Sequence, residues 1–279
     1  MTNCVFERYK NKHLGERVFL IGNGPSLADT DLSLLEGENS IAMNRVSLIY
    51  DKSSEWRPTY YLFSSTNVRA SKPWHQKWRH SVTEAVKSDQ TTSFIAEIFR
   101  NDIDPHNKYK NIKWFSKMSE NKPDAFGNIH ESCFSADIVE RIDKTGTTMN
   151  LALQLVFHMG FSEVVFLGAD LGWKHDRAST KDPNHFSSDY TADIPRPEKA
   201  NNQMRNIHSL AVKKFRENKK GVKFYNASLK TVLDVYPIIN FEEYINKNEI
   251  VYRPDDMRVA KDFWDDEYQF DGINYDDFK

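Results

Sequence analysis

The chain has 279 residues, of which 39% are hydrophobic, and it carries a formal net charge of -2. This is enough for one large α/β domain with a sizeable core, and the near-neutral charge gives no reason to expect nucleic acid or an acidic membrane as the main partner. No apolar run approaches the roughly 20 residues of a membrane-spanning helix, and the N-terminus lacks an apolar signal region. Cys4 and Cys133 show neither metal-ligand spacing nor a disulfide framework. We therefore expect a soluble, cytoplasmic protein that could reach a membrane only peripherally.

The first predicted element is a β-strand over 18–21 that ends in a glycine-rich turn. The turn residues are Gly22, Asn23, Gly24, Pro25 and Ser26. The two glycines allow unusual backbone angles and a close approach to a ligand, the proline fixes φ, and the serine can accept from free N–H groups where a helix starts. Open α/β sheets bind nucleotides at such strand ends. We predict a nucleotide site here, the alternative being an ordinary tight βα turn.

Two further predicted strands, over 40–43 and 59–63, also end in small polar residues. Asn44 follows the first, and Ser64 and Ser65 follow the second. Because the carboxyl ends of parallel strands meet at one edge of a sheet, the three strand ends predict one shared crevice.

The middle of the chain is less regular than the helix that follows it. The region from about 70 to 140 is irregular, so we expect an insertion of short strands and helices with long connections. A mostly apolar helix over 149–160 follows, ended by a glycine and buried against the sheet. His158, late in this helix, is expected to pack or cap rather than to catalyse. A buried parallel strand over 163–170 comes next, so that helix and strand form half of a βαβ unit.

The last third adds a loop, a helix, a strand and an acidic arm. The polar loop over 171–197 follows a central strand directly, which is typical of a lid or substrate loop. A helix is predicted over 200–218 and a strand over 222–228. We expect one Rossmann-like α/β domain over 1–250, an open and mostly parallel sheet flanked by helices. The arm over 251–279 fits a disordered tail, an amphipathic arm or an oligomer contact.

Two Asp-x-Asp sequences raise the question of a metal ion. The tripeptides at 29–31 and 102–104 both match the pattern with which many nucleotide-sugar enzymes bind Mg²⁺ or Mn²⁺. Neither ends an apolar strand, and Asp31 fits better as a helix cap. Asp170, at the end of a buried strand, is better placed for a ligand or a metal, or for capping the following loop. We assign no metal-binding residue.

Four segments together resemble a known superfamily. They are the turn over 22–27, Asn44, the pair Thr147 and Thr148, and the run over 160–170. Their order and spacing resemble the bacterial sialyltransferases of the Campylobacter lipooligosaccharide type. They are equally similar to the wider MptE-like proteins (the DUF115 domain), which include motility-associated flagellin glycosyltransferases and archaeal 6-hydroxymethylpterin diphosphokinases. The resemblance covers about 17–68 and 145–230.

This resemblance implies a set of donor-binding residues. In the sialyltransferases, the turn and the Asn of the second strand hold a cytidine nucleotide and its sugar, and a hydroxyl pair that opens the later helix contacts the same donor. The implied set, with the strand-end residues added, is Gly22, Asn23, Gly24, Pro25, Ser26, Asn44, Ser64, Thr147, Thr148 and Asp170. The chain departs from the family twice. Ser64 or Ser65 stands where the family has Asn, and Thr145, beside Lys144, stands where it has Arg, which leaves the donor sugar open.

The resemblance also implies a histidine base in the loop after the Gly-x-Asp strand. His185 is the natural candidate, but one alignment places Asp189 on the catalytic histidine of the family, so Asp189 remains its rival. Sugar transfer needs a base for the acceptor proton and stabilisation of the leaving phosphate. A histidine suits the first task. The N–H groups of the turn over 22–26, the threonine hydroxyls and Tyr190 suit the second.

The resulting prediction is an inverting, metal-independent glycosyltransferase. It would move a sialic-acid-like sugar from a CMP-activated donor to a glycan or glycolipid acceptor in surface-glycan or lipopolysaccharide biosynthesis, with no cofactor, and a homo-oligomer is possible. One alternative is a Mg²⁺-dependent diphosphokinase that acts on a pterin-like alcohol, with Asp170 and either Asp176 or Asp189 holding the metal. The sequence has no Walker-type loop. Another alternative is a non-catalytic nucleotide-sugar-binding module.

Overall fold

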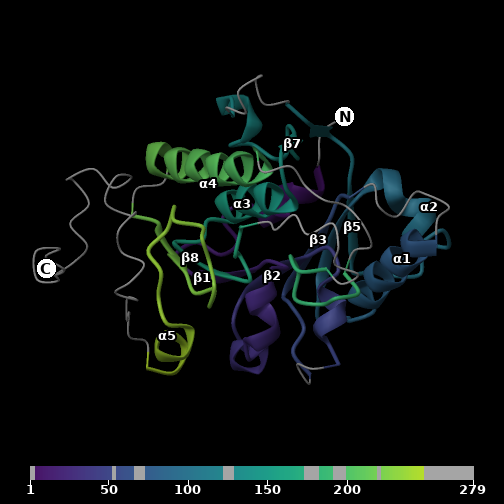
Figure 1. Cartoon of the computed structure of the whole chain (residues 1–279). Helices are drawn as coiled ribbons and strands as arrows, with labels where there is room; N and C mark the ends of the chain where they lie inside the picture. Colours follow the sequence, from purple (N-terminus) through teal and green to yellow (C-terminus); the bar gives the residue numbers. More distant parts are fainter. Residues whose placement is uncertain are drawn as a thin grey trace, which may run out of the picture.

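A parallel β-sheet forms the centre of the molecule (Figure 1). The computed structural model describes residues 4–51, 55–65, 73–121, 129–172, 182–190, 199–218 and 221–247. Within these ranges the main sheet has seven strands in the order β5-β4-β3-β2-β1-β8-β9, and all paired neighbours are parallel. The strands are β1 (Arg17–Ile21), β2 (Ser40–Met43), β3 (Tyr60–Phe63), β4 (Thr92–Ala96), β5 (Ile112–Phe115), β8 (Glu163–Leu167) and β9 (Lys223–Asn226). A separate pair consists of β6 (Met118–Ser119) and β7 (Ile142–Asp143).

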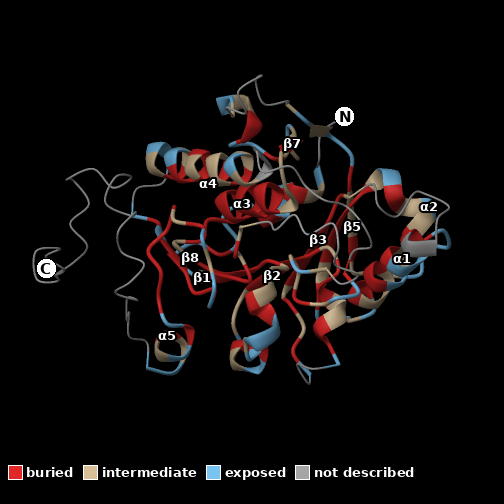
Figure 2. Cartoon of the chain, viewed as in Figure 1, coloured by how far each residue is buried: buried red, intermediate tan, exposed pale blue. Residues whose placement is uncertain are grey.

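Helices cover both faces of the sheet. The α-helices are α1 (Pro73–Val86), α2 (Arg100–Ile103), α3 (Thr148–Met159), α4 (Lys199–Asn218) and α5 (Phe241–Lys247). Short 3-10 helices are η1 (Cys4–Tyr9), η2 (Pro25–Asp29), η3 (Leu32–Leu35), η4 (Val46–Ile49), η6 (Glu97–Phe99) and η7 (Glu131–Cys133). Figure 1 shows α3 and α4 on one face, with α5 and the 3-10 helices that follow β1 on the other. Because both faces are covered, the central strands are continuous apolar runs that are buried along their length (Figure 2).

The order of the strands places a switch point between β1 and β8. From β1 the chain moves outward through β2 and β3 on one side, whereas β8 and β9 lie on the other side. At such a reversal the loops after neighbouring strands diverge and leave a crevice at the carboxyl ends. The predicted Rossmann-like class, an open parallel α/β sheet flanked by helices, is therefore confirmed.

Helix α3 forms as its sequence predicts. The Thr147 side chain caps the helix by accepting from the N–H of Met149, and Gly160 ends it in the left-handed region at φ 86°. His158 is buried, and its Nε2 lies 2.9 Å from the carbonyl oxygen of Phe6. This histidine has the packing role that was expected.

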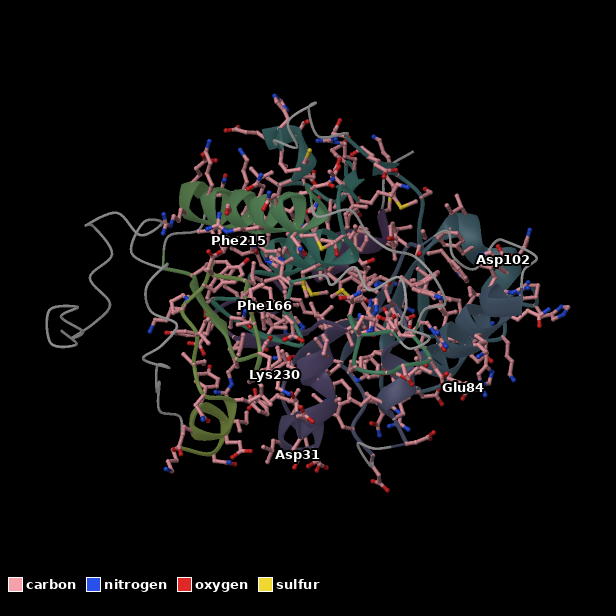
Figure 3. The ribbon with its side chains drawn as sticks, viewed as in Figure 1. Asp31, Glu84, Asp102, Phe166, Phe215 and Lys230 are labelled. Carbon is pink, nitrogen blue, oxygen red and sulfur yellow. The ribbon has the colours of Figure 1, made fainter. Side chains whose placement is uncertain are left out.

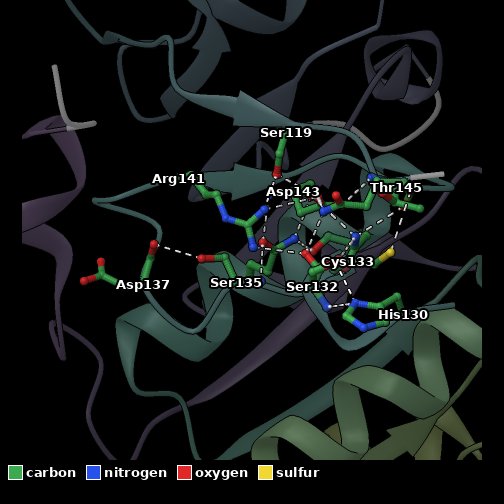
Figure 4. A network of polar contacts seen from close by, with 12 residues as sticks. Ser119, His130, Ser132, Cys133, Ser135, Asp137, Arg141, Asp143 and Thr145 are labelled. Carbon is green, nitrogen blue, oxygen red and sulfur yellow. Dashed lines mark hydrogen bonds and ion pairs between the residues drawn. The ribbon is translucent and has the colours of Figure 1, made fainter.

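A buried polar network fixes the chain just before α3 (Figure 4). The Asp143 carboxylate accepts from the N–H of Thr145 at 2.9 Å, from Ser119 Oγ at 2.7 Å and from Asn121 Nδ2 at 2.8 Å. Gln154 of α3 in turn accepts from the N–H of Asp143 at 2.9 Å. The network therefore ties the β6–β7 pair to α3 and sets where that helix begins.

The expected insertion over 70–140 is wrong in one respect. Strands β4 and β5 lie within it and extend the main sheet, and α1 is a regular helix of 14 residues. The single domain over 1–250 remains a prediction, and the arm over 251–279 lies outside the described residues. Of the predicted loop over 171–197, the structure describes 171–172 and 182–190. Among the described helices, none is long and apolar enough to cross a membrane.

Candidate active site

A cavity of about 340 Å³ opens where the predicted strand ends meet. The predicted residues that line it from the strand ends are Gly22, Asn23, Gly24, Asn44, Ser64 and Asp170. Those that line it from α3 and from the loop are Thr147, Thr148, His185 and Tyr190. Pro25, Ser26 and Asp189 do not line the cavity. Segments more than 100 residues apart in the sequence thus share one space.

The glycines of the turn after β1 lie against the end of β8. Gly24 has φ -68°, so no unusual backbone angle is involved. A Cβ on Gly24 would lie 2.7 Å from the carbonyl oxygen of Gly168 and closer still to the Asp170 carboxylate. A Cβ on Gly22 would likewise clash with the backbone of Gly168. Both glycines therefore permit the close approach of this turn to the end of β8.

Most N–H groups of this turn donate hydrogen bonds to other groups of the protein. The N–H of Gly22 donates to the Leu167 carbonyl at 2.7 Å, and that of Gly24 donates to the Gly168 carbonyl at 2.8 Å. The N–H of Ser26 donates to Asp170 Oδ2 at 2.7 Å. Three of the four N–H groups over 22–26 are thus used, which corrects the expectation that this turn cradles the leaving phosphate.

Asp170 holds the turn in place. The hydroxyl of Ser26 donates to Asp170 Oδ1, and the N–H of Ser26 donates to Oδ2, so each carboxylate oxygen accepts from the same serine. The carboxylate is 4% exposed. Asp170 is therefore first of all the link between the ends of β8 and β1.

Two asparagines that follow strands β1 and β2 line the cavity. The side-chain amide of Asn23 donates to the Met43 carbonyl at 3.3 Å, which ties the first turn to β2. Asn44 lies at φ 56°, a left-handed conformation that asparagine tolerates better than most residues. Its Oδ1 accepts from Thr148 Oγ1 at 3.2 Å. This last bond joins two of the motifs on which the resemblance rests.

The start of α3 is the part of the cavity best suited to an anion. Gly146, Thr147 and Thr148 line the wall, so the positive end of the helix dipole borders the cavity. Thr147 Oγ1 is used to cap the helix, whereas Thr148 Oγ1 reaches Asn44.

The residues at the two departures from the family differ in whether they line the cavity. Ser64 and Ser65 both line the cavity. Thr145 is buried and donates to the Asn121 carbonyl at 2.7 Å, away from the lining. Lys144 lines the cavity, where its ammonium lies 2.9 Å from the Glu120 carboxylate. The cation at this place in the cavity wall is therefore Lys144.

His185 forms a pair that sequence reasoning missed. Its Nδ1 lies 2.7 Å from Asp182 Oδ2, and the two side chains are only 9% and 3% exposed. An ionised carboxylate only accepts, so Nδ1 carries the proton and Nε2 is the basic nitrogen of the neutral ring. The Asp182–His185 pair is the arrangement that orients a general base. Asp182 lies three residues before His185 in a loop, where no periodicity marks it.

The rest of this loop packs around His185. The Tyr190 ring stacks on the His185 ring with centroids 3.8 Å apart, and the N–H of Phe186 donates to the Asn23 carbonyl at 3.1 Å. Asp189 is exposed, and its carbonyl accepts from Arg45. Of the two rivals, His185 borders the cavity and Asp189 does not.

Helix α4 supplies a wall that the sequence did not assign to the site. Met204 and His208, one helical turn apart, line the cavity together with Leu233. His208 Nδ1 lies 2.9 Å from the Tyr236 hydroxyl, and burial lowers the pKa of His208 to about 3. With so low a pKa this histidine is a weak base, which makes it a poorer candidate for the catalytic base than His185. Its i, i+4 spacing with Met204 was visible in the sequence, but the spacing alone indicates only a buried helix face.

Neither Asp-x-Asp sequence forms part of the site. Asp31 accepts from the N–H of Ser33 at 3.0 Å as a helix cap, and Asp104 accepts from the N–H of Lys108 at 2.7 Å. Figure 3 shows Asp31 and Asp102 at separate places on the molecule. Within the described ranges, no cluster of three or more His, Cys, Asp or Glu side chains could hold a metal ion.

Comparisons with known proteins yield only distant structural similarity. No family model matches the sequence, and a comparison with curated proteins finds no match. Among solved structures, the chain is similar to the sialyltransferase CstII from Campylobacter jejuni in complex with a substrate analogue, cytidine-5'-monophosphate, at 13% identity and a TM-score of 0.41, over 80% of this chain and 84% of that one. It is also similar to the sialyltransferase CST-II in complex with trisaccharide acceptor and CMP, at 14% identity and a TM-score of 0.42, over 79% and 84%. Similarity this low defines neither a family nor an activity for the chain.

Proposed function

We propose that the chain is an inverting glycosyltransferase that takes an acidic sugar from a CMP-activated donor. The observation that carries this proposal is the Asp182–His185 pair, of which His185 borders the same cavity as the strand-end motif. A base beside a nucleotide-type crevice is what transfer to a hydroxyl acceptor requires. The proposed acceptor is a surface glycan or glycolipid, and the proposed location is the cytoplasm.

The anionic parts of the donor have two supports in the cavity wall. The N-terminus of α3 favours a phosphate through its dipole. Lys144 supplies a full positive charge for the phosphate or the sugar carboxylate, once the ligand displaces Glu120. Tyr190, Thr147 and Thr148 add hydroxyl groups on the same wall.

The proposed reaction is a single displacement. The acceptor oxygen bonds to the anomeric carbon while the bond from that carbon to the phosphate oxygen breaks, and CMP leaves with the bonding electrons. The acceptor proton passes to Nε2 of His185, and Asp182 stabilises the resulting imidazolium. Attack opposite to the leaving group inverts the anomeric centre.

The diphosphokinase alternative would have Asp170 and a second carboxylate hold Mg²⁺. Both oxygens of Asp170 accept from Ser26. Asp189 is exposed and does not line the cavity, and Asp176 lies outside the described residues. The contacts of Asp170 thus favour the glycosyltransferase.

A thermal-shift panel of nucleotides, with and without Mg²⁺, tests the proposal. CMP at about 100 times its Kd stabilises the fold by about 2.7 kcal/mol, which raises Tm by roughly 5 °C for a chain of this size. We expect such a shift with CMP or CDP in the absence of metal. A shift only with ATP or GTP plus Mg²⁺ would overturn the proposal in favour of the diphosphokinase. A shift with UDP or GDP would keep a glycosyltransferase but exclude the CMP donor.

Catalysis needs its own measurement, because a binding module would also give the shift. Release of CMP from a CMP-activated acidic sugar in the presence of a glycan acceptor, followed by mass spectrometry of the product, separates the two. Donor binding without turnover across an acceptor panel would favour the non-catalytic module.

A further inference from the structure

Arg45 is a buried cation that the proposed reaction does not use directly. It follows Asn44 at the end of β2, is 3% exposed and does not line the cavity. Burial is the largest influence on its guanidinium and lowers its pKa. A buried charge is costly unless its hydrogen-bond donors are satisfied. The partners that satisfy Arg45 therefore show what it does.

Those partners lie on the loop that carries His185. Arg45 Nη1 donates to the Asp189 carbonyl at 2.5 Å and also to the Tyr190 carbonyl. Its Nε donates to Ser81 Oγ of α1 at 3.0 Å. The guanidinium thus links β2, α1 and the end of the 182–190 loop in one contact.

Two aromatic rings complete the surroundings of the guanidinium. Its Cζ lies 5.7 Å from the centroid of the Trp78 ring and 5.8 Å from that of Tyr190, and these two rings pack edge to face at 5.7 Å. Ring faces stabilise a cation where water is excluded. None of the ion pairs between described residues involves Arg45, so carbonyls and rings provide its compensation.

The contact reaches His185 through one residue. The Tyr190 carbonyl accepts from Arg45, while the Tyr190 ring stacks on the His185 ring at 3.8 Å and 10° between planes. Asp182 holds the Nδ1 edge of the same imidazole. Without the Arg45 hydrogen bonds, the Tyr190 ring would no longer be held in one position. The His185 ring that stacks on it would then lose its orientation toward the cavity.

We propose that Arg45 is a positioning residue that holds His185 at the cavity by clamping the carbonyls of Asp189 and Tyr190. The kinetic part of this inference rests on the proposed function, whereas the structural part does not. A lysine could not replace it, because one ammonium cannot span two loop carbonyls and Ser81 as a planar guanidinium does.

Limited proteolysis of Arg45→Met tests the clamp without any activity assay. Methionine keeps the length and packs against Trp78 without a buried charge, so the fold should survive. Chymotrypsin cuts after aromatic residues, and Phe186 and Tyr190 are buried in the native loop. We expect mass-spectrometric mapping to show at least tenfold faster cleavage after these two residues. Arg100→Met is the matched control, since Arg100 also lies over a tryptophan ring, 4.6 Å from the centroid of Trp114.

Kinetics then separate positioning from simple stabilisation. We expect Arg45→Met to lower kcat at least tenfold. The KM for the donor and the Kd for CMP should rise less, by no more than about fivefold, because among the proposed donor contacts only the Tyr190 hydroxyl depends on Arg45. Arg45→Lys should change both readouts in the same direction. Cleavage and kcat equal to those of Arg100→Met would overturn the inference. Faster cleavage in a protein whose wild type transfers no sugar would uphold the clamp and reject the proposed function instead.

Discussion

The cavity has two rims that are held in different ways. The strand-end rim consists of the turn over 22–26 with Asn44 and Asp170, and the loop rim consists of residues 182–190. The strand-end rim is fixed mainly by main-chain donors that reach the end of β8. Among the described residues, the loop rim makes one main-chain bond to that rim, from Phe186 to Asn23, and the side chains of Arg45, Asp182 and Tyr190 supply further contacts.

This difference suggests how the work of the site is divided. A rim held by main-chain bonds to a buried sheet is formed before a ligand arrives, so it suits binding. A rim held by an arginine, a carboxylate and stacked rings changes with single substitutions, and it carries the proposed base. Substitutions on the two rims should therefore separate affinity from catalysis.

The largest effect is expected on the loop rim, from His185→Asn. Loss of a general base lowers kcat by about 10²–10⁴-fold, while the Kd for CMP should stay unchanged because the strand-end rim is intact. Initial rates of CMP release with saturating acceptor measure it. Asp189→Asn is the control and should retain wild-type kcat, because this carboxylate is exposed outside the cavity. The reverse ranking of the two variants would make Asp189 the base.

On the strand-end rim, Gly22→Ala should act on stability. The new Cβ would clash with the backbone of Gly168, which cannot move without disturbing β8. We expect a loss of about 3 kcal/mol in the free energy of unfolding in urea. Gly37→Ala is the control, since its Cβ would meet open space and only its φ of 81° costs about 1 kcal/mol. Equal losses of unfolding free energy in both variants would mean that Gly22 is not in close contact with the backbone of Gly168.

Sequence reasoning predicted the strand-end rim better than the loop rim for a physical reason. Strands β1, β2, β3, β8 and β9 and helices α3 and α4 follow from local hydrophobic pattern and from glycine and threonine signals at their ends. The polar residues at those ends were placed together because parallel strands end at one edge. For Gly22 and Gly24 the sequence did not indicate the contact with the end of β8, because that contact joins segments far apart in the chain.

The parts that were missed depend on contacts that no local pattern encodes. Arg45 meets Tyr190 across 145 positions of sequence. Asp182 pairs with His185 in a loop with neither 3.6- nor 2-residue periodicity. Strands β4 and β5 are short apolar runs within polar surroundings, so they did not stand out from the irregular middle of the chain.

A third prediction concerns the α4 wall that faces both rims. Burial lowers the pKa of His208 to about 3, well below the ordinary value of 6.5. Below pH 6.5 the unfolded chain therefore binds a proton that the folded chain does not, so stability falls as the pH falls. Between pH 6.5 and 5 this group should lower the free energy of unfolding by about 2 kcal/mol.

His208→Gln should remove that part of the acid sensitivity in urea unfolding followed from pH 7 to pH 5. Glutamine can still bond the Tyr236 hydroxyl but does not titrate. The comparison variant is His80→Gln, whose side chain is 74% exposed in the wild type. The same slope in wild type and His208→Gln would mean that His208 is protonated in the folded state.

The smallest effects are expected from the threonine pair. Substitution of Thr147 should lower stability, and substitution of Thr148 should lower the affinity for CMP. Thr147→Val removes the cap of α3, which costs about 1 kcal/mol of stability. Thr148→Val instead removes the hydroxyl that reaches Asn44 at 3.2 Å beside the proposed donor phosphate. Loss of one hydrogen bond of about 1 kcal/mol corresponds to a roughly fivefold weaker Kd for CMP in isothermal titration. Since valine keeps the shape of threonine, an unchanged Kd in Thr148→Val would show that this hydroxyl orders the strand-end rim without touching the donor.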